Sequence, residues 1–224
     1  MSVSSLNPRG TASRFIVVEG PIGVGKTALA TRLADSMSAD LVLEEVEANP
    51  FLERFYRDGS RAALPAQMFF LFARARQLED LRQSDLFTDV RVADYLFAKD
   101  RLFAELNLDS DELALYDKVA ENLAVEPPVP DLVIYLQASV DALMERIARR
   151  GIQFERMIDR HYLERLTDTY ARFFHAYNEG PLLIVNASQI DPIHNEVDYA
   201  QLFKQIEGTT GGRHFFNPVS AALA

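Results

Sequence analysis

Short apolar runs alternate with longer stretches of helical hydrophobic spacing along this chain. The apolar runs are four to six residues long and rich in Val, Ile, Leu and Phe, which is typical of buried β-strands. Strands that alternate with helices indicate a parallel sheet covered on both faces. We therefore expect a five-stranded parallel sheet. Its predicted strands are residues 14–19, 41–44, 89–94, 131–136 and 181–185.

The stretches between these strands repeat apolar residues at the spacing of a helix face. Leu29, Leu33 and Met37 give this spacing directly after the first strand. Asn49-Pro50 looks like a helix N-cap and first helical residue, and Ser139 looks like another N-cap. The predicted helices cover residues 28–37, a segment from 49, 65–83, 97–107, 110–124, 139–149 and 159–177. Together these elements predict an α/β fold in three α/β/α layers.

Composition limits the class of protein. The 224 residues suit one domain, expected over 14–207, with flexible tails at 1–13 and 208–224. A net charge of −10 argues against binding of nucleic acid or an anionic membrane, because phosphate backbones need a basic surface. No apolar run approaches the ~20 residues of a membrane span. The absence of cysteine fits a reducing compartment, so we expect a cytoplasmic protein.

A glycine-rich motif between the first strand and the first helix carries the clearest chemistry. Gly20-Pro-Ile-Gly-Val-Gly-Lys-Thr27 fits G-x-x-x-x-G-K-[ST], the phosphate-binding P-loop. Its three glycines let backbone N–H groups face phosphates, and the helix N-terminus adds partial positive charge. In such a loop the Lys26 ammonium reaches the β- and γ-phosphates, and the Thr27 hydroxyl is a ligand of Mg²⁺. The sequence therefore predicts ATP binding at residues Gly20, Pro21, Ile22, Gly23, Val24, Gly25, Lys26 and Thr27.

Two acids follow predicted strands, where ligands bind in parallel sheets. Glu44 closes the second strand and Asp94 the third. A phosphoryl acceptor needs a carboxylate to orient its hydroxyl and take its proton, and Mg²⁺ needs a second oxygen ligand. We assign the first role to Glu44 and the metal role to Asp94. The alternative is that either acid is simply solvated at a strand end.

Two further segments have polar residues in a pattern that suits a ligand. Gln67 and Arg74 share a helix face with Phe70, as in a pocket for a flat polar base, although an amphipathic surface helix reads the same way. Arg149 and Arg150 end a helix before a glycine and suit either phosphates or the helix dipole. The four histidines have no metal-ligand spacing.

From about residue 15 to residue 188 these motifs together resemble the deoxynucleoside kinase family, bacterial deoxyadenosine and deoxyguanosine kinases in particular. The resemblance implies a P-loop NTPase-type fold with a helical lid. The segment from Glu44 to Tyr56 resembles the family segment that supplies the catalytic base and a sugar contact, which implies these roles for Glu44 and Tyr56.

The resemblance also extends to base recognition and to the lid. Gln67, with Arg74 seven residues later, resembles the family's base-reading helix, and the helix after the third strand brings Asp100 and the stacking residue Phe103. In the family, an Arg–Asp pair beside a Gln implies a nucleoside substrate whose base is a purine or cytosine. The segment from Glu145 to Glu155 resembles the lid, which implies catalytic contacts of Arg146 and Arg150 with the donor phosphates and a 3′-hydroxyl contact of Glu155.

One motif departs from the family pattern. Members usually have an acid-Arg-Ser triplet after the third strand, whereas this chain has Asp94-Tyr95-Leu96. The Arg that holds the catalytic carboxylate and the 5′-oxygen is therefore missing. Arg101 or a lid arginine is the expected substitute, with low turnover as the other outcome.

These observations predict an ATP- and Mg²⁺-dependent kinase that phosphorylates the 5′-hydroxyl of a deoxynucleoside, a purine one in the first place. The rivals are a nucleoside-monophosphate kinase of thymidylate type and a non-catalytic nucleotide-binding regulator. A GTPase is disfavoured because no N-K-x-D motif is present. The resemblance implies a homodimer through residues 113–125 and the Gln67 helix, with small molecules as the other partners.

Overall fold

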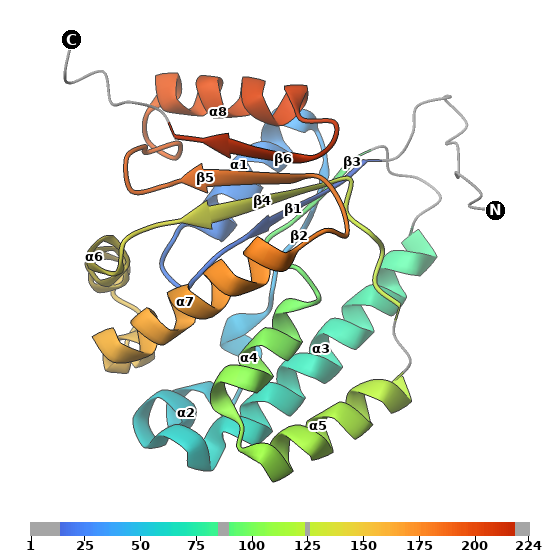
Figure 1. Ribbon diagram of the computed structural model, residues 1–224, viewed down its shortest axis with the longest axis vertical. Helices are drawn as coiled ribbons and strands as arrows, with labels where there is room; N and C mark the ends of the chain where they lie inside the picture. The colour runs from blue at the N-terminus through green and yellow to red at the C-terminus, as the bar shows by residue number, and fades with distance from the viewer. Residues whose placement is uncertain (1–13, 85–89, 124–125, 218–224) are drawn as a thin grey trace.

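A single parallel sheet of six strands runs through the centre of the molecule (Figure 1). The computed structural model describes residues 14–84, 90–123 and 126–217. The strand order is β2-β3-β1-β4-β5-β6, so the first strand lies inside the sheet between β3 and β4. The strands are β1 (Arg14–Glu19), β2 (Asp40–Val42), β3 (Val90–Ala93), β4 (Leu132–Gln137), β5 (Leu182–Asn186) and β6 (Arg213–Phe216).

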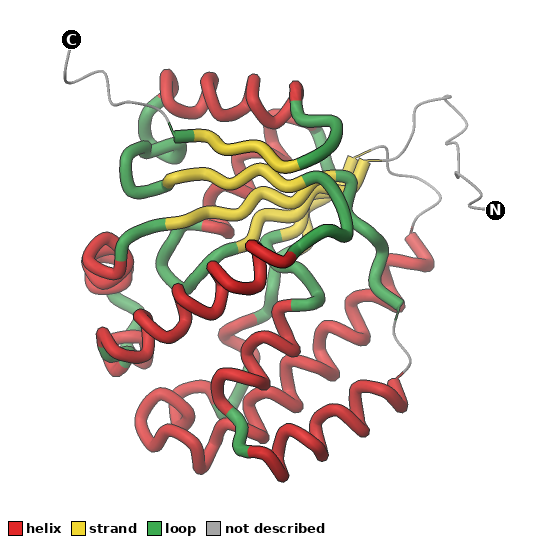
Figure 2. Tube along the Cα trace, in the orientation of Figure 1, coloured by secondary structure: helices red, strands yellow, loops and turns green. Residues whose placement is uncertain are grey.

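Helices cover both faces of this sheet, which confirms the predicted α/β fold in three layers (Figure 2). They are α1 (Lys26–Met37), α2 (Leu52–Asp58), α3 (Ala63–Ser84), α4 (Lys99–Asn107), α5 (Ser110–Leu123), α6 (Val140–Arg150), α7 (Arg160–Ala176) and α8 (Glu196–Gly208). Within the three described ranges, every helix is too short or too polar to cross a bilayer.

The two helical layers are built differently. On one face α1 packs on β1 and β3, and α8 joins it through Tyr199, whose hydroxyl donates to the Arg32 carbonyl at 3.1 Å and is hydrogen-bonded to the Ser36 hydroxyl at 2.6 Å. On the other face α7 and α4 pack together, with α3 and α5 farther from the sheet (Figure 1). The α6 helix lies beyond the carboxyl ends of β4 and β5. This end of the sheet is where parallel sheets bind ligands.

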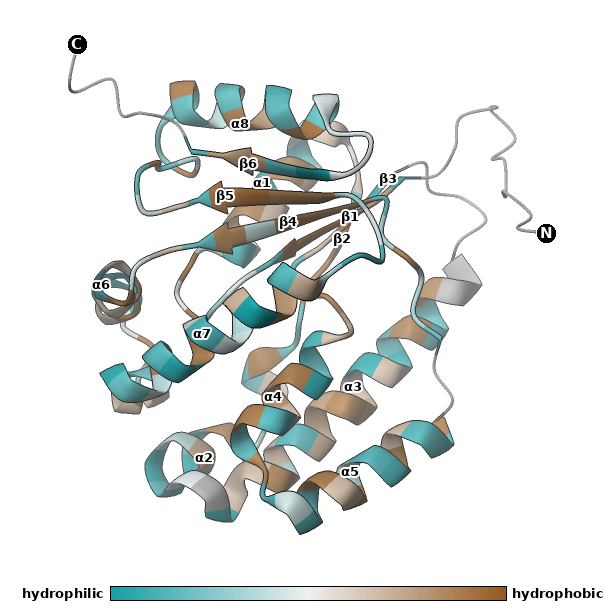
Figure 3. Ribbon diagram, viewed as in Figure 1, coloured by the Kyte–Doolittle hydropathy of each residue, from teal (hydrophilic) through white to brown (hydrophobic). Residues whose placement is uncertain are grey.

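The core is apolar and close to fully buried, as the strand sequences require. Figure 3 shows the central strands as predominantly hydrophobic, whereas the helices carry polar residues on their outer surfaces. Tyr135 of β4 stacks on Tyr170 and Phe174 of α7, with ring centroids 6.1 Å and 4.1 Å away. These rings join the sheet to the layer that carries part of the site.

The sixth strand corrects the prediction of five strands and of a tail from residue 208. β6 pairs in parallel with β5, Leu182 opposite Arg213 and Val185 opposite Phe216. The Arg213 guanidinium donates to three carbonyls at the end of α7, those of Phe174, His175 and Tyr177, at 2.9–3.1 Å. The stretch after residue 208 is therefore part of the folded domain at least to Phe216. Helix α8 was also not predicted.

Two predicted boundaries also differ from the structure. β2 ends at Val42, so Glu44 lies two residues beyond the strand instead of closing it. Asn49 is not the N-cap of α2, which begins at Leu52. Its side chain instead accepts from the Phe51 N–H at 3.0 Å and donates to the Ala66 carbonyl at 3.1 Å, which joins α2 to α3. The tail at 1–13, residue 89, residues 124–125 and the tail from 218 lie outside the described residues.

Candidate active site

The P-loop connects β1 to α1 with a backbone that its glycines make possible. Gly20, Gly23 and Gly25 all have positive φ, at 152°, 83° and 103°. A Cβ on Gly20 would lie 2.5 Å from the Leu136 carbonyl oxygen, and one on Gly23 would lie 2.7 Å from Ile147. The loop is therefore pressed against β4 and α6 at positions where only glycine fits.

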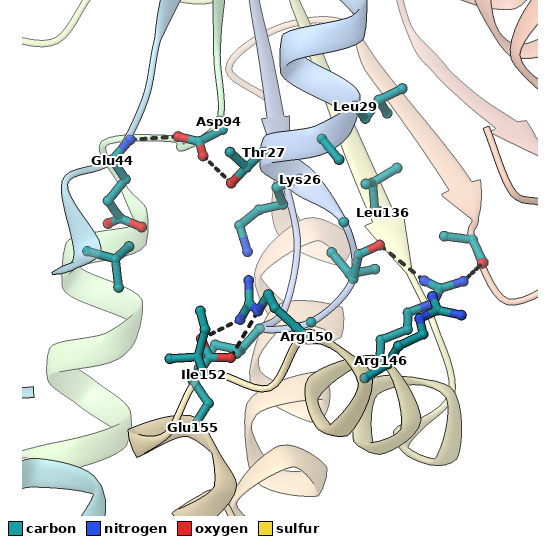
Figure 4. Close-up of a pocket in the computed structure, with 18 of the residues that line it drawn as sticks. Lys26, Thr27, Leu29, Glu44, Asp94, Leu136, Arg146, Arg150, Ile152 and Glu155 are labelled. Carbon is teal, nitrogen blue, oxygen red and sulfur yellow. Dashed lines mark hydrogen bonds and ion pairs between the residues drawn. The ribbon is translucent and has the colours of Figure 1, made fainter. Parts of the chain in front are cut away.

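Lys26 and Thr27 begin α1 and project into the site (Figure 4). The Lys26 ammonium donates to the Gly20 carbonyl at 2.8 Å and to the Pro21 carbonyl at 3.2 Å. Burial, and after it the positive charge of Lys99, lower the pKa of Lys26 to about 8. A polyphosphate beside this ammonium would offset that burial and keep it charged.

The two predicted metal ligands lie side by side. Thr27 Oγ1 donates to Asp94 Oδ2 at 2.6 Å, and the Glu44 backbone N–H donates to Asp94 Oδ1 at 2.8 Å (Figure 4). Asp94 follows β3 directly, and its own N–H donates to the Val42 carbonyl at 3.1 Å. The end of β3 thus fixes the P-loop hydroxyl and the segment that carries Glu44.

The Glu44 carboxylate is buried between two cations. Arg74 of α3 contacts one of its oxygens, and Lys99 of α4 donates to the other, Oε2, at 2.7 Å. Burial alone would raise the pKa of Glu44, but Arg74 and Lys99 outweigh it and lower the pKa to about 2. The two cations therefore favour the ionised form of Glu44, which is a hydrogen-bond acceptor.

Arg74 joins this carboxylate to the predicted base-reading residues. Its second Nη atom contacts Asp100, so one guanidinium bridges Glu44 and Asp100. Burial opposes the charge of Arg74, but Asp100 and Glu44 prevail and raise its pKa. Gln67 lies on the same helix, and Phe70 packs its ring centroid 5.0 Å from the guanidinium carbon. Gln67 Oε1, Arg74 Nε and Asp100 Oδ2 are buried without a hydrogen-bond partner among the described residues.

Tyr56 and the lid residues line the same cavity as the P-loop. The Tyr56 ring stacks on Phe154, with centroids 6.1 Å apart and planes 7° apart. Arg150 Nε donates to Glu155 Oε2 at 3.0 Å, and Figure 4 shows this pair below Lys26. Glu155 is 4 % exposed and Arg150 is only half-buried, so the arginine faces the open part of the site.

Arg146 lies farther from the Glu44 end of the site (Figure 4). It donates to the Val24 carbonyl at 3.1 Å and to the Ala187 carbonyl at 2.6 Å. It thus holds the P-loop against the segment after β5, residues 187–194, which also lines the site. Sequence reasoning missed this segment, although its place beyond a parallel strand was a usable signal.

Most of these side chains line one cavity of about 1440 Å³. At one end lie Tyr56, Gln67, Phe70, Arg74 and Phe103, in the middle Lys26, Thr27, Glu44 and Asp94, and at the other end residues 187–194. Of the predicted base contacts, Asp100 does not line the cavity but pairs with Arg74, which does. The volume is ample for two ligands joined end to end across the P-loop.

The departure from the family triplet has a clear structural outcome. The Tyr95 hydroxyl turns to α3 and donates to Gln77 Oε1 at 2.8 Å. Arg101 is not the substitute we expected: it is 47 % exposed and pairs with Glu105 and Asp117. The lid's Arg150 is engaged by Glu155. Lys99 contacts Glu44 instead. Sequence reasoning missed Lys99 because a lysine at the start of a helix is usually exposed to solvent.

A P-loop with a facing carboxylate, on a parallel sheet with a lid helix, defines an α/β phosphotransferase of the P-loop NTPase fold. Residues 16–210 match the family described as deoxynucleoside kinase. The chain is 36 % identical over 200 residues to a deoxyguanosine kinase of Bacillus subtilis, covering 86 % of this chain and 96 % of that protein. It is 30 % identical over 208 residues to a deoxyadenosine kinase of Lactobacillus acidophilus, covering 87 % and 95 %.

The chain therefore belongs to the deoxynucleoside kinase family and is an ATP-dependent phosphotransferase that acts on deoxynucleosides. The relatives favour this activity over the two rivals, a monophosphate kinase and a non-catalytic regulator. A deoxyadenosine kinase structure from M. mycoides with bound dATP has the same fold, with a TM-score of 0.76 and 24 % identity over 87 % of this chain and all of that one.

Proposed function

We propose that the chain transfers the γ-phosphoryl group of ATP to the 5′-hydroxyl of the purine deoxynucleosides deoxyadenosine and deoxyguanosine, with deoxycytidine as a further acceptor. The relatives named above are deoxyguanosine and deoxyadenosine kinases, and another from Bacillus subtilis is a deoxyadenosine/deoxycytidine kinase. The observation that carries the proposal is the Arg74 guanidinium, which bridges Asp100 and the Glu44 carboxylate and so joins base recognition to the reacting end.

The polar atoms at the Gln67 end suit the edge of a purine. Gln67 offers both a donor and an acceptor, and its Oε1 is buried with no protein partner among the described residues. Arg74 adds an N–H donor that is equally unpaired, since its Nε has no partner there either. Buried polar groups that lack partners favour a ligand that supplies them and reject one that does not. Phe70 and Phe103 offer apolar surface for the flat ring.

The sugar lies, in this proposal, between Tyr56 and Glu155. Both side chains line the cavity on the side of Glu44. Burial raises the pKa of Tyr56, so its hydroxyl is neutral and available as a donor and an acceptor. A tyrosine hydroxyl and a carboxylate together suit a free 3′-hydroxyl. We therefore expect 3′-deoxy analogues to be poorer acceptors.

Phosphoryl transfer depends on positioning and on charge stabilisation more than on covalent help from the protein. Glu44 orients the 5′-hydroxyl and accepts its proton as the new oxygen–phosphorus bond forms and the bond to the bridging oxygen of ADP breaks. Lys26, Arg150 and Arg146 stabilise the charge on the transferring group and the leaving group. All four side chains line the same cavity.

Thr27 and Asp94 are the proposed holders of Mg²⁺. Their side-chain oxygens are 2.6 Å apart at the start of α1, and hydroxyl and carboxylate oxygens are the ligands that Mg²⁺ prefers. The donor set therefore fits. Held by these two side chains, the ion would supply positive charge that offsets the negative charge of the donor phosphates.

A substrate panel tests the proposed function. The enzyme with labelled ATP and Mg²⁺ is given deoxyadenosine, deoxyguanosine, deoxycytidine and thymidine, with dAMP and dTMP as the acceptors of a monophosphate kinase. We expect the two purine nucleosides to be best and the monophosphates to be inert. In the same assay Glu44→Gln should lower kcat by ~10²-fold or more. Preference for thymidine or for a monophosphate would refute the purine assignment.

We further propose a homodimer and a cytoplasmic location. Phe72 of α3 and Leu115 of α5 are large apolar side chains that are 47 % and 50 % exposed, and the two helices pack together. An exposed apolar surface of this kind is typical of subunit interfaces. Light scattering of the purified chain, compared with a Phe72→Glu variant, tests the dimer.

A further inference from the structure

Lys99 is the first residue of α4, and its side chain turns inward to the catalytic carboxylate. Its Nζ lies 2.7 Å from Glu44 Oε2 and 5.6 Å from the centre of the Phe103 ring. The Lys99 and Glu44 side chains are only 7 % and 8 % exposed. An ammonium this deeply buried costs several kcal/mol unless it is paired, so its place beside Glu44 calls for an explanation.

The residues expected to replace the missing arginine do not contact Glu44. Tyr95, where an arginine is usual, is neutral and engaged with Gln77. Arg101 pairs with Glu105 and Asp117 at the surface. Within the described ranges, Arg74 and Lys99 are the two cations in ion-pair distance of Glu44, and Arg74 is shared with Asp100.

The charge of Lys99 and its number of hydrogen-bond donors suit the reacting end of the cavity. Burial opposes its charge, but Glu44 and Glu19 prevail and raise the pKa of Lys99, so it stays an ammonium. An ammonium has three N–H donors, and Glu44 takes one of them. Lys99 lines the same cavity as Lys26 and Glu44, which places its ammonium at the end of the cavity that holds the Glu44 carboxylate.

We propose that Lys99 is the positioning residue of this enzyme, which fixes Glu44 toward the acceptor hydroxyl from α4 in place of the arginine missing after Asp94. The inference rests on the proposed function, because it assigns Lys99 a role in that reaction. The cation has moved from the residue after Asp94 to a position one helical turn farther along the chain. Tyr95 then serves the fold by linking the end of β3 to α3.

Steady-state kinetics with matched variants test this inference. Lys99→Met removes the charge and keeps the length of the side chain, Lys99→Arg keeps the charge, and Arg101→Met is the surface control. With the best nucleoside of the panel, Lys99→Met should lower kcat roughly 30- to 300-fold and change KM for the nucleoside less than about threefold. Lys99→Arg should recover at least about a tenth of the wild-type kcat. Arg101→Met should match the wild type.

Two measurements separate a positioning role from a packing role. If Lys99 acts through Glu44, adding Lys99→Met to Glu44→Gln should slow the enzyme less than twofold further, because effects within one unit are not additive. In Lys99→Ala, n-propylammonium should restore turnover in a saturable way, whereas n-propanol should not. Thermal melting of each variant reports whether it is folded.

The outcomes distinguish this inference from the proposed function. A wild-type enzyme that phosphorylates no nucleoside overturns both. An active wild type whose Lys99→Met variant keeps kcat within twofold overturns the role of Lys99 alone. Equal losses in Lys99→Met and Lys99→Arg, with no effect of n-propylammonium, would also overturn it, because charge would then be irrelevant.

Discussion

The Arg74→Met variant offers the sharpest test of how the site is held together. Arg74 is 4 % exposed and contacts both Glu44 and Asp100. Methionine fills most of the same volume but provides no charge, so two buried carboxylates lose a shared partner. Glu44 keeps Lys99 at 2.7 Å, whereas Asp100 keeps no cation in ion-pair distance within the described residues. The cost should therefore arise mainly at Asp100.

Removing one partner of a buried ion pair typically costs ~3–5 kcal/mol. Because only one of the two acids is left unpaired, we expect about 3 kcal/mol in the free energy of unfolding. For a chain of this size that lowers Tm by roughly 6–12 °C. Adding Asp100→Asn should recover at least about 1 kcal/mol, because an amide is far cheaper to bury than an unpaired carboxylate. Urea denaturation of the two variants and the wild type measures these differences.

The same reasoning predicts how the stability of Arg74→Met varies with pH. Burial already raises the pKa of Asp100 in the folded protein, and loss of Arg74 should raise it further. A carboxyl group with a raised folded-state pKa stabilises the fold at low pH and loses that contribution as pH rises toward the folded-state value. The deficit of Arg74→Met relative to wild type should thus be smaller at pH 5 than at pH 7. Arg101→Met, at an exposed ion pair, is the control. A Tm for Arg74→Met within about 1 °C of wild type, with no recovery by Asp100→Asn, would show that Arg74 does not stabilise Asp100 in the fold.

The tight packing of Gly20, the carboxylate of Asp94 and the guanidinium of Arg213 can each be tested by one substitution. Gly20→Ala should abolish detectable ATP binding in calorimetry, because the added Cβ would lie 2.5 Å from the Leu136 carbonyl oxygen. An unchanged affinity for ATP would contradict the tight packing of the loop. Asp94→Asn should raise the Mg²⁺ concentration for half-maximal activity about tenfold or more, and EDTA should stop the wild-type reaction; an unaltered Mg²⁺ titration would remove Asp94 from the metal site. Arg213→Met should lower the free energy of unfolding by about 1 kcal/mol, since three carbonyls at the end of α7 lose their donor. A Tm equal to wild type would show that water replaces the guanidinium.

The strands that the sequence predicted well are those whose residues are buried on both faces. β4 and β5 are near-continuous apolar runs, and nearly every residue in them is buried. β6 has only four residues, Arg213-His-Phe-Phe216, and although their burial alternates, the residue types do not follow it, because Phe215 lies on the exposed side. An edge strand of this kind is specified by its partner more than by its own pattern.

The P-loop and the acids after β2 and β3 were likewise predictable, because local sequence and strand order bring them together. The pairing of Lys99 with Glu44 was not, since 55 positions separate them and only the placement of α4 beside the end of β2 joins them. Arg101 was the expected partner of Glu44 because it is an arginine, but its side chain pairs with Asp117 of α5 instead. Tertiary packing decides which side chains in the first turn of a helix point inward. The sequence near that turn carries little information about it.

The late position of β6 has a consequence for synthesis. β5 is paired on one side by β4, and its other edge is covered only when β6 arrives, roughly 30 residues later in the chain. At ~5–20 residues per second a ribosome needs about 2–6 s for that distance. During that interval, and for longer in any chain cut before Arg213, an apolar strand edge stays open to a neighbouring chain. The nascent kinase is therefore expected to depend on chaperones most while α8 and β6 are being made.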